Sequence, residues 1–499
     1  MEKNIIIVGA GIAGLSAGCY ARMNGYRVSI FEMNSFPGGL CAAWKRKGYT
    51  WDISMHIVAG SRRGQFRRMW EELGVVGHRE FYYHRELTRL EDGENEITIG
   101  LDRREVEKAM LAISPDDAAM IKKFTALLYG KPLMKMANLK PKEFLTIFDI
   151  VRKIAGMLRS IGPIIRYSKL TLQDFADTFK NPFLRNAVRF VIDSPGWPMP
   201  GFPLVGIAGF LKAGMVNAGV PLGGSQQIVS GIADRFQNLG GEIHYKRCIK
   251  KLIIDTGRVV GVRLENGGEH RADTVIWAAD GHQLIFDMLE GCYVNKNIRT
   301  MYDNWIPVAP LVQVMIGVNR DMSREPHRVV IKLEKPIRIA DEDHRWMSVI
   351  HHCFDPSMAP PGKSSVEVWF ATDYAYWKAL SGDHKKYEEE KKRIADCTIA
   401  HLDRKWPGFA GQVEVVDIPT PVTYARYTGN WRGSPDGWYV TRENMMKSGM
   451  LRSLPGLNGL YMVGHWTAPF TGTVRAALSG RQVMQIICRR DRRRFKASL

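Results

Sequence analysis

Three glycines near the N-terminus have the spacing of a turn that binds a pyrophosphate. Gly9, Gly11 and Gly14 follow a short apolar run at 5–8 and open an apolar stretch at 15–24 that favours a helix. In such a turn the first glycine permits the tight bend, the second lets the backbone approach the phosphates, and the third lets helix and strand pack closely. Free N–H groups at the start of the helix attract the negative charge. This spacing predicts a dinucleotide site.

An acidic residue follows where a dinucleotide ribose needs one. Glu32 ends a second apolar stretch at 27–31, about twenty residues beyond the glycines, where a carboxylate accepts the ribose hydroxyls. A carboxylate there disfavours a 2′-phosphate, so FAD or NAD fits better than NADP. Two observations favour FAD. No second G-x-G-x-x-G follows an apolar strand, and Gly38 and Gly39 offer a loop that passes closely against an extended dinucleotide.

Three polar residues are candidates for proton chemistry: His56, His465 and Arg475. Histidine exchanges a proton near neutral pH, although His56 is also consistent with a structural histidine and His465 with cofactor binding alone. Arg475 is expected to balance the negative charge of a bound cofactor rather than to take part in the reaction. The run at 351–353, His-His-Cys, predicts no metal site, because adjacent strand positions point to opposite faces and no second ligand pair follows.

The elements that position these residues alternate along the chain. Strand and helix signals alternate at the start, return near the middle and recur once more near the C-terminus, whereas 105–215 is mostly helical. This pattern predicts an α/β fold in which one domain is interrupted twice. We expect a dinucleotide-binding domain at 1–100, 220–300 and 432–488, an inserted α+β substrate domain at 101–219 and 301–431, and a basic tail at 489–499.

Four blocks resemble the phytoene desaturase, carotenoid isomerase and retinol saturase family of flavoproteins, and the resemblance spans nearly the whole chain. The blocks are 9–15 with Glu32 and 38–39; 48–54; 220–228 with 240–252; and 459–480. The last aligns with the family's flavin segment through Gly464, Pro469, Gly472 and Ser479. The sequence departs from the family at Ser54 and Met55, where Gly-Pro is usual, at Phe470 and Thr471, where small residues are usual, and at Arg475, where proline or glycine is frequent.

The resemblance implies a Rossmann-type FAD-binding domain of the glutathione-reductase-like, GDP-dissociation-inhibitor-like flavoprotein fold. It also implies specific cofactor contacts: the backbone of Ile249 at the adenine, and the backbone N–H groups of Thr473 and Val474 at the flavin's pyrimidine edge. The expected cofactor-binding residues are Gly9, Gly11, Ile12, Ala13, Gly14, Glu32, Gly38, Gly39, Leu40, Ile249, Ala279, Gly464, His465, Gly472, Thr473 and Val474.

The resemblance further implies an FAD-dependent oxidoreductase acting on CH–CH groups of a hydrophobic polyene, retinoid or other lipid. Desaturation, saturation and flavin-assisted isomerisation all remain open. The apolar stretch 197–220 is consistent with a substrate tunnel or with plain core. Two other readings stay open: a flavin amine oxidase, which shares the fold, and a non-enzymatic isoprenoid carrier of the GDP-dissociation-inhibitor type, which does without flavin.

Net charge and amphipathicity point to an anionic surface. The formal charge of the chain is +19. Residues 131–170 hold nine Lys or Arg and two acids, with apolar residues at helical spacing, and six more basic residues lie in 489–496. Such a helix either lies on an anionic membrane or packs on the core with a solvated face. We expect peripheral membrane association, and no nucleic-acid binding because no recognition motif accompanies the charge.

The remaining features concern compartment and topology. The seven cysteines form no C-x-x-C pair, and the first expected strand begins at Asn4, which leaves no room for a signal peptide. These features favour the cytoplasm. The uncharged run 194–211 has four prolines and four glycines, which argues against a membrane-spanning helix. The sequence leaves the oligomeric state open.

Overall fold

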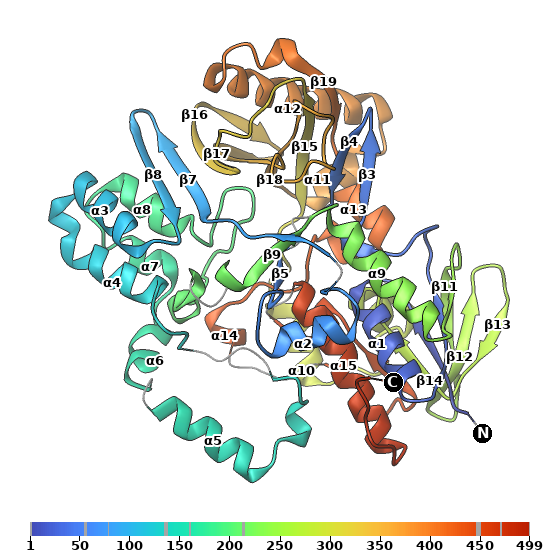
Figure 1. Cartoon of the computed structure of the whole chain (residues 1–499). Coiled ribbons are helices and arrows are strands. Elements are labelled where there is room, and N and C mark those ends of the chain that lie inside the picture. Colours follow the sequence, from blue (N-terminus) through green and yellow to red (C-terminus); the bar gives the residue numbers. More distant parts are fainter. Residues whose placement is uncertain are drawn as a thin grey trace.

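The computed structural model describes residues 2–53, 57–77, 79–133, 138–158, 161–211, 215–445, 451–469 and 472–498. Two sheet-centred regions and a helical lobe make up the molecule (Figure 1). Among these residues no helix combines the length and the apolar character needed to cross a membrane.

The first region is built on a five-stranded, fully parallel sheet in the order β10-β2-β1-β14-β20. Its strands are β1 (Asn4–Val8), β2 (Arg27–Phe31), β10 (Glu242–His244), β14 (Thr274–Trp277) and β20 (Leu460–Met462). β1 lies at the centre and is buried on both faces, which explains its unbroken apolar sequence. Strands from the start, the middle and the end of the chain therefore complete one sheet.

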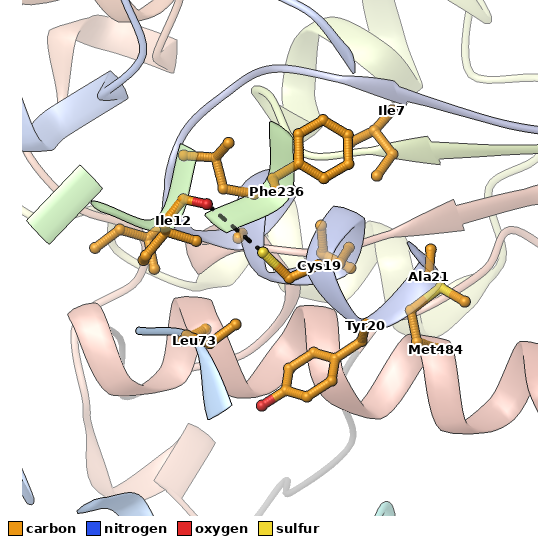
Figure 2. Packing of buried hydrophobic residues seen from close by; sticks show 14 of the residues in the cluster. Ile7, Ile12, Cys19, Tyr20, Ala21, Leu73, Phe236 and Met484 are labelled. Carbon is orange, nitrogen blue, oxygen red and sulfur yellow. Dashed lines mark hydrogen bonds between the residues drawn. The ribbon is translucent and has the colours of Figure 1, made fainter. Parts of the chain in front are cut away.

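Three helices cover one face of this sheet: α1 (Ile12–Met23), α9 (Ser225–Asn238) and α15 (Thr473–Arg490). Figure 2 shows Ile7 of β1 and Tyr20 of α1 in this layer, with Phe236 from α9 and Met484 from α15. The first and last of these helices touch through small residues. A side chain on Gly480 would lie 2.6 Å from the Ala13 carbonyl oxygen, so α15 crosses directly over α1.

The opposite face of the sheet is covered by the antiparallel strands β11 (Ile249–Asp255), β12 (Arg258–Leu264) and β13 (Glu269–Arg271), and by α10 (Lys296–Asn304). Helix, parallel sheet and meander form the three layers of a Rossmann-type domain. Two small sheets join this region to the rest: β3 (Ala43–Arg46) with β4 (Tyr49–Asp52), and β5 (Val58–Ala59) with β9 (Ala218–Pro221) and β6 (Phe81–Tyr82). Helix α2 (Gln65–Glu72) lies between β5 and β6 in sequence.

The second region is a seven-stranded mixed sheet in the order β19-β15-β18-β17-β16-β7-β8. Its strands are β7 (Glu86–Asp92), β8 (Asn95–Gly100), β15 (Leu311–Val318), β16 (Arg328–Ile339), β17 (Glu342–His351), β18 (Ser364–Ala371) and β19 (Val413–Asp417). One face packs on α11 (Tyr374–Leu380) and α12 (His384–Lys405). β7 and β8 lie inside the range 1–100 expected in the dinucleotide-binding domain, yet β7 pairs with β16, so residues 86–100 are part of the second sheet.

The helical lobe contains α3 (Arg103–Ile113), α4 (Ala118–Leu128), α7 (Leu172–Ala176) and α8 (Pro182–Arg189), which share one apolar cluster. The stretch considered as a possible tunnel lining contributes mostly to this closed cluster, through Phe202, Leu204 and Ile207. Two further helices, α5 (Ile147–Leu158) and α6 (Ile161–Ser168), extend from the lobe at the lower left of Figure 1. The remaining α-helices in the described residues are α13 (Pro421–Thr428) and α14 (Arg442–Met445).

Candidate functional site

A cleft of about 350 Å³ lies at the carboxyl ends of the central parallel strands. Val8, Phe31 and Trp277, which end β1, β2 and β14, all line it. This edge of a doubly wound sheet is where dinucleotides bind. Because the lining also includes residues of the C-terminal segment, both ends of the chain form a single site.

The glycine turn has the geometry that its spacing predicts. Gly9 has a φ of +100°, which a side chain disfavours. A Cβ on Gly14 would lie 2.0 Å from the Gly9 carbonyl oxygen, so only glycine lets α1 approach β1 so closely. A Cβ on Gly11 would meet nothing nearer than the Gly38 carbonyl oxygen at 3.9 Å and would therefore project into open space at the cleft. Gly14 itself does not line the cleft and acts through packing.

In the part of the chain that the structure describes, two helices begin at this cleft without a side-chain cap. Gly11 precedes α1 and Gly472 precedes α15, and neither supplies an oxygen to the first-turn N–H groups. Such uncapped N-termini attract anions through the free N–H groups and the helix dipole. The α1 N-terminus fits a pyrophosphate. The α15 N-terminus, with Thr473 lining the cleft, offers a second positive end to an electron-rich ring.

The Glu32 carboxylate lines the cleft, and hydrogen bonds from Ala10 and Asn34 hold it in place. Its Oε2 accepts a hydrogen bond from the backbone N–H of Ala10 at 2.8 Å, and its Oε1 accepts two bonds from Asn34 at 2.9 Å. A carboxylate has about four acceptor positions, so Glu32 keeps capacity for ribose hydroxyls. Asn34 also lines the cleft, and the sequence analysis did not identify it.

His465 is the catalytic candidate that the structure places at the cleft. Its Nε2 is buried and has no hydrogen-bond partner in the described part of the chain. Burial lowers the pKa of His465, and the nearby Asp436 carboxylate opposes that shift only in part. His465 is therefore neutral at pH 7, with one ring nitrogen available to a bound molecule.

The structure does not place the other two catalytic candidates, His56 and Arg475, in the lining of the cleft. His56 lies outside the described residues, as do the departures from the family pattern at 54–55 and 470–471. Arg475 is described but does not line the cleft. Burial lowers its pKa, although a guanidinium stays charged at neutral pH.

Most of the expected cofactor residues do line this cleft, including the central and C-terminal positions Ile249, Ala279 and Gly464. Val474 of α15 does not line the cleft, because its side chain packs in the apolar layer that α15 shares with α1. Further lining residues have no motif of their own: Met33, Cys41, Ile57, Trp197, Arg247, Cys248, Trp277, Ala278, Gln283, Tyr427, Thr428, Gly429, Asn430, Pro435, Asp436, Trp466 and Ala476. Arg247 and Cys248 could have been found as neighbours of Ile249, whereas 427–430 reach the cleft through tertiary folding.

A second, small cavity of about 20 Å³ lies between the regions, beside Asp52 and three histidines, His84, His327 and His352. Burial raises the pKa of Asp52 to about 6, while hydrogen bonding from Ser225 lowers it in part. Burial disfavours the charged form of His352, but the Glu367 carboxylate at 3.1 Å, together with Asp52 and Asp355, raises its pKa. In the described residues no group of three or more His, Cys, Asp or Glu side chains could hold a metal ion.

The chain is similar to a known domain family and to several curated proteins. Residues 7–73 match the model of the NAD(P)-binding Rossmann-like domain. Over 510 residues the chain is 24% identical to the chloroplastic prolycopene isomerase of Daucus carota, covering 96% of this chain and 79% of that one. It is 28% identical over 518 residues to the zeta-carotene-forming phytoene desaturase of Myxococcus xanthus, covering 97% and 93%.

Solved structures confirm the expected fold. An oxidoreductase from Methanosarcina mazei is similar with a TM-score of 0.59 and 16% identity over 97% of this chain and all of that one. Putrescine oxidase bound to putrescine gives 0.61 and 13%, covering 98% and 99%. A Rab GDI from Plasmodium falciparum gives 0.52 and 11%, covering 99% of each chain. Since an oxidase and a GDI both share this fold, fold alone does not select the activity.

Proposed function

We propose that this relative of the carotenoid isomerases and phytoene desaturases is an FAD-dependent oxidoreductase acting on carbon–carbon bonds of a hydrophobic polyene or related lipid. The observation that carries the proposal is the cleft in which Glu32 and two uncapped helix N-termini face one cavity. The names of the sequence relatives support a carotenoid-like substrate.

The residues present fit FAD along the whole cleft. Glu32 would bind the ribose, the α1 N-terminus the pyrophosphate, and the backbone at Ile249 the adenine. The uncapped N-terminus of α15 would stabilise negative charge on the reduced ring. When bound, FAD supplies the capacity to accept or donate a hydride at carbon.

His465 is the proposed acid–base residue. A neutral imidazole whose Nε2 has no partner among the described residues can hold a proton beside the reacting carbon, or anchor the cofactor. Arg475 would add positive charge to the first turn of α15 without touching the substrate. His56 remains a candidate on sequence grounds alone. The chain's own residues leave the direction of reaction open among desaturation, saturation and isomerisation.

The apolar part of the cleft suits a hydrophobic substrate. Ile57, Trp197 and Trp466 line the cleft and would exclude water from the reacting atoms. Because a polyene is stored in lipid, we propose that the enzyme works peripherally at an anionic membrane surface on the cytoplasmic side. The proposed domain ranges are those given by sequence, with residues 86–100 moved to the substrate domain.

The first test is cofactor retention. The purified chain should be yellow, and Gly11→Val should lose flavin absorbance, because the added side chain would occupy the space at the phosphates. Gly411→Val is the matched control, since a Cβ there would meet nothing within 4 Å and Gly411 does not line the cleft. A wild-type chain that is colourless and does not take up FAD would overturn the proposal.

The second test identifies the reaction. Oxidised and reduced enzyme would be incubated without oxygen with polyenes, retinoids and unsaturated acyl lipids, and the products weighed by mass spectrometry. Loss of two hydrogens, gain of two, or an unchanged mass with altered geometry separates the three chemistries. Peroxide release with amines would establish the amine-oxidase alternative instead, and isoprenoid binding by a flavin-free chain would establish the carrier.

A further inference from the structure

We propose that α5 and α6 form an insertion element that docks the enzyme on an anionic lipid bilayer, with the apolar face of α5 in the outer part of the leaflet. The proposal deepens the suggested membrane association by naming the surface that makes it. It rests on the proposed function only for the purpose of docking, which is to collect a lipid-soluble substrate.

Exposed apolar side chains are concentrated on these two helices. In the described part of the chain, fourteen large hydrophobic side chains are exposed, and seven of them lie on α5 and α6. Ile147 is 82% exposed and Phe148 is 72% exposed. The seven residues are Ile147, Phe148, Ile150, Val151, Ile154, Ile161 and Ile165. A patch of this kind on a monomeric protein marks an interaction site.

The sequence of α5 separates apolar and charged residues onto opposite faces. Ile147, Ile150, Val151 and Ile154 recur at the i, i+3, i+4 and i+7 positions of one stripe, and Phe148 widens it. Asp149 and Arg152 fall on the opposite face. An isolated helix of 12 residues is only marginally stable in water, so α5 gains from an apolar surface that covers its stripe.

The surroundings select an anionic bilayer as that surface. Residues 140–169 contain seven basic and two acidic residues. The guanidinium of Arg489, at the end of α15, lies 4.8 Å from the ring centroid of Phe144, which brings the basic C-terminal segment next to the start of α5. Apolar side chains flanked by Lys and Arg match the acyl boundary and the headgroups of an anionic leaflet.

The base of the element is fixed to the cofactor-binding region. Glu143, just before α5, pairs with Arg452, whose Nη2 donates a hydrogen bond to Gln482 of α15 at 2.7 Å. The Gln482 side chain in turn donates to the carbonyl of Asn138 at 2.8 Å. The same helix begins at the cleft, so the docking element has a fixed position relative to the site.

The far side of the element borders the apolar lobe. Helix α6 contacts the 3-10 turn Leu204–Ile207 of the lobe's core, in the same stretch of chain that begins with the cleft residue Trp197. A bilayer that received α5 and α6 would therefore lie against the lobe that adjoins the cleft. This arrangement suits transfer of a substrate from lipid without passage through water.

Vesicle binding tests the proposal on the full chain with its cofactor. Wild-type protein should sediment with vesicles of phosphatidylcholine and phosphatidylglycerol, and much less with phosphatidylcholine alone. Raising the salt from about 0.05 to about 0.5 M should weaken binding. The triple variant Phe148→Ser, Val151→Ser, Ile154→Ser should need at least about tenfold more lipid for half-binding, because three apolar side chains lose their transfer into lipid.

A matched control and a second readout keep the test decisive. Ile254→Ser with Ile306→Ser removes apolar side chains that are 38% and 52% exposed elsewhere, and should bind vesicles like wild type. Equal vesicle binding by the triple variant and wild type would overturn the proposal. So would a wild type that forms a dimer and binds no vesicles, if the triple variant is monomeric. Flavin absorbance in every variant shows whether the cofactor site is intact, so failure of docking is separable from failure of the proposed function.

Discussion

The layer around α1 and the exposed helices α5 and α6 use the same residue types for opposite purposes. In the first, Ile5 and Ile7 are at most 1% exposed and pack beneath α1 and α15. In the second, Ile147 and Ile154 are 82% and 54% exposed. The apolar side chains of the layer around α1 are thus covered within the chain. The apolar face of α5 is left uncovered by the described residues, and a lipid surface is the proposed cover.

The two regions also treat charge differently. Beneath α1, the guanidinium of Arg481 forms a buried pair with Glu72 at 2.9 Å, and Tyr20 donates to the same carboxylate at 2.6 Å. Around α5 the basic residues are mostly exposed, and Lys140 approaches Asp149 only to 3.7 Å. Buried pairs fix the geometry of the first region, whereas unburied cations leave the second free to meet an anionic partner.

The largest effect is expected at the closest contact of the cofactor region. Gly14→Val would place a Cβ 2.0 Å from the Gly9 carbonyl oxygen, and backbone cannot yield as a flexible side chain does. We expect a loss of more than about 5 kcal/mol in the free energy of unfolding, which is enough to prevent folding. Urea denaturation followed by circular dichroism measures this. A cooperative wild-type-like transition would contradict this close packing of α1 on β1.

A smaller loss is expected at the buried ion pair. Glu72→Leu leaves the Arg481 guanidinium without its buried partner and should cost about 3–4 kcal/mol of unfolding free energy. The double variant Glu72→Leu, Arg481→Met should recover most of the loss, since no charge is then stranded. Urea denaturation of the single and double variants decides this, and a double variant as unstable as Glu72→Leu would disprove the pairing.

The sequence predicted the cofactor region better than the second region, for a physical reason. Gly9, Gly11 and Glu32 work through local backbone geometry, which a short motif specifies, and their expected placement at one edge of the sheet follows. Asn34 was missed although it lies only two residues beyond Glu32. Asp436 and Tyr427 reach the cleft through long-range folding, and no local sequence pattern predicts their position there.

Strand pairing and the exposure of side chains are harder to predict from the sequence than the glycine turn. The alternating residues of β7 and β8 predict strands, but their partner β16 lies more than two hundred positions away, so the sheet they join could not be assigned. The amphipathic pattern of α5 was visible in the sequence. Whether its apolar stripe is buried or exposed depends on tertiary packing, and the two outcomes share one pattern.

The next effect is a change in pH dependence at the junction between the regions. Burial holds the pKa of Asp52 at about 6, above its ordinary 3.8, so the folded state favours the protonated form. The contribution of Asp52 to stability is therefore most favourable below about pH 4 and is lost as pH rises to about 6. Asp52→Asn should match wild type at pH 4 and exceed its stability by about 2–3 kcal/mol at pH 7.

Unfolding in urea across pH 4–8 measures this difference. Asp341→Asn is the control, because that carboxylate is fully exposed and pairs only at the surface with Arg338. Its stability should follow wild type at every pH. A constant offset between Asp52→Asn and wild type, with no dependence on pH, would show that Asp52 is not buried in its charged form.

The smallest effect is expected at the exposed apolar side chains of α5. Ile147→Ser and Phe148→Ser remove large apolar side chains, as a core substitution does, yet they should change the free energy of unfolding by no more than about 0.5 kcal/mol because both are already exposed. Ile7→Ser, with a side chain that is fully buried beneath α1, should cost several times more. Equal losses in urea denaturation would mean that α5 packs on the body in solution, and its stripe would then not be available to lipid.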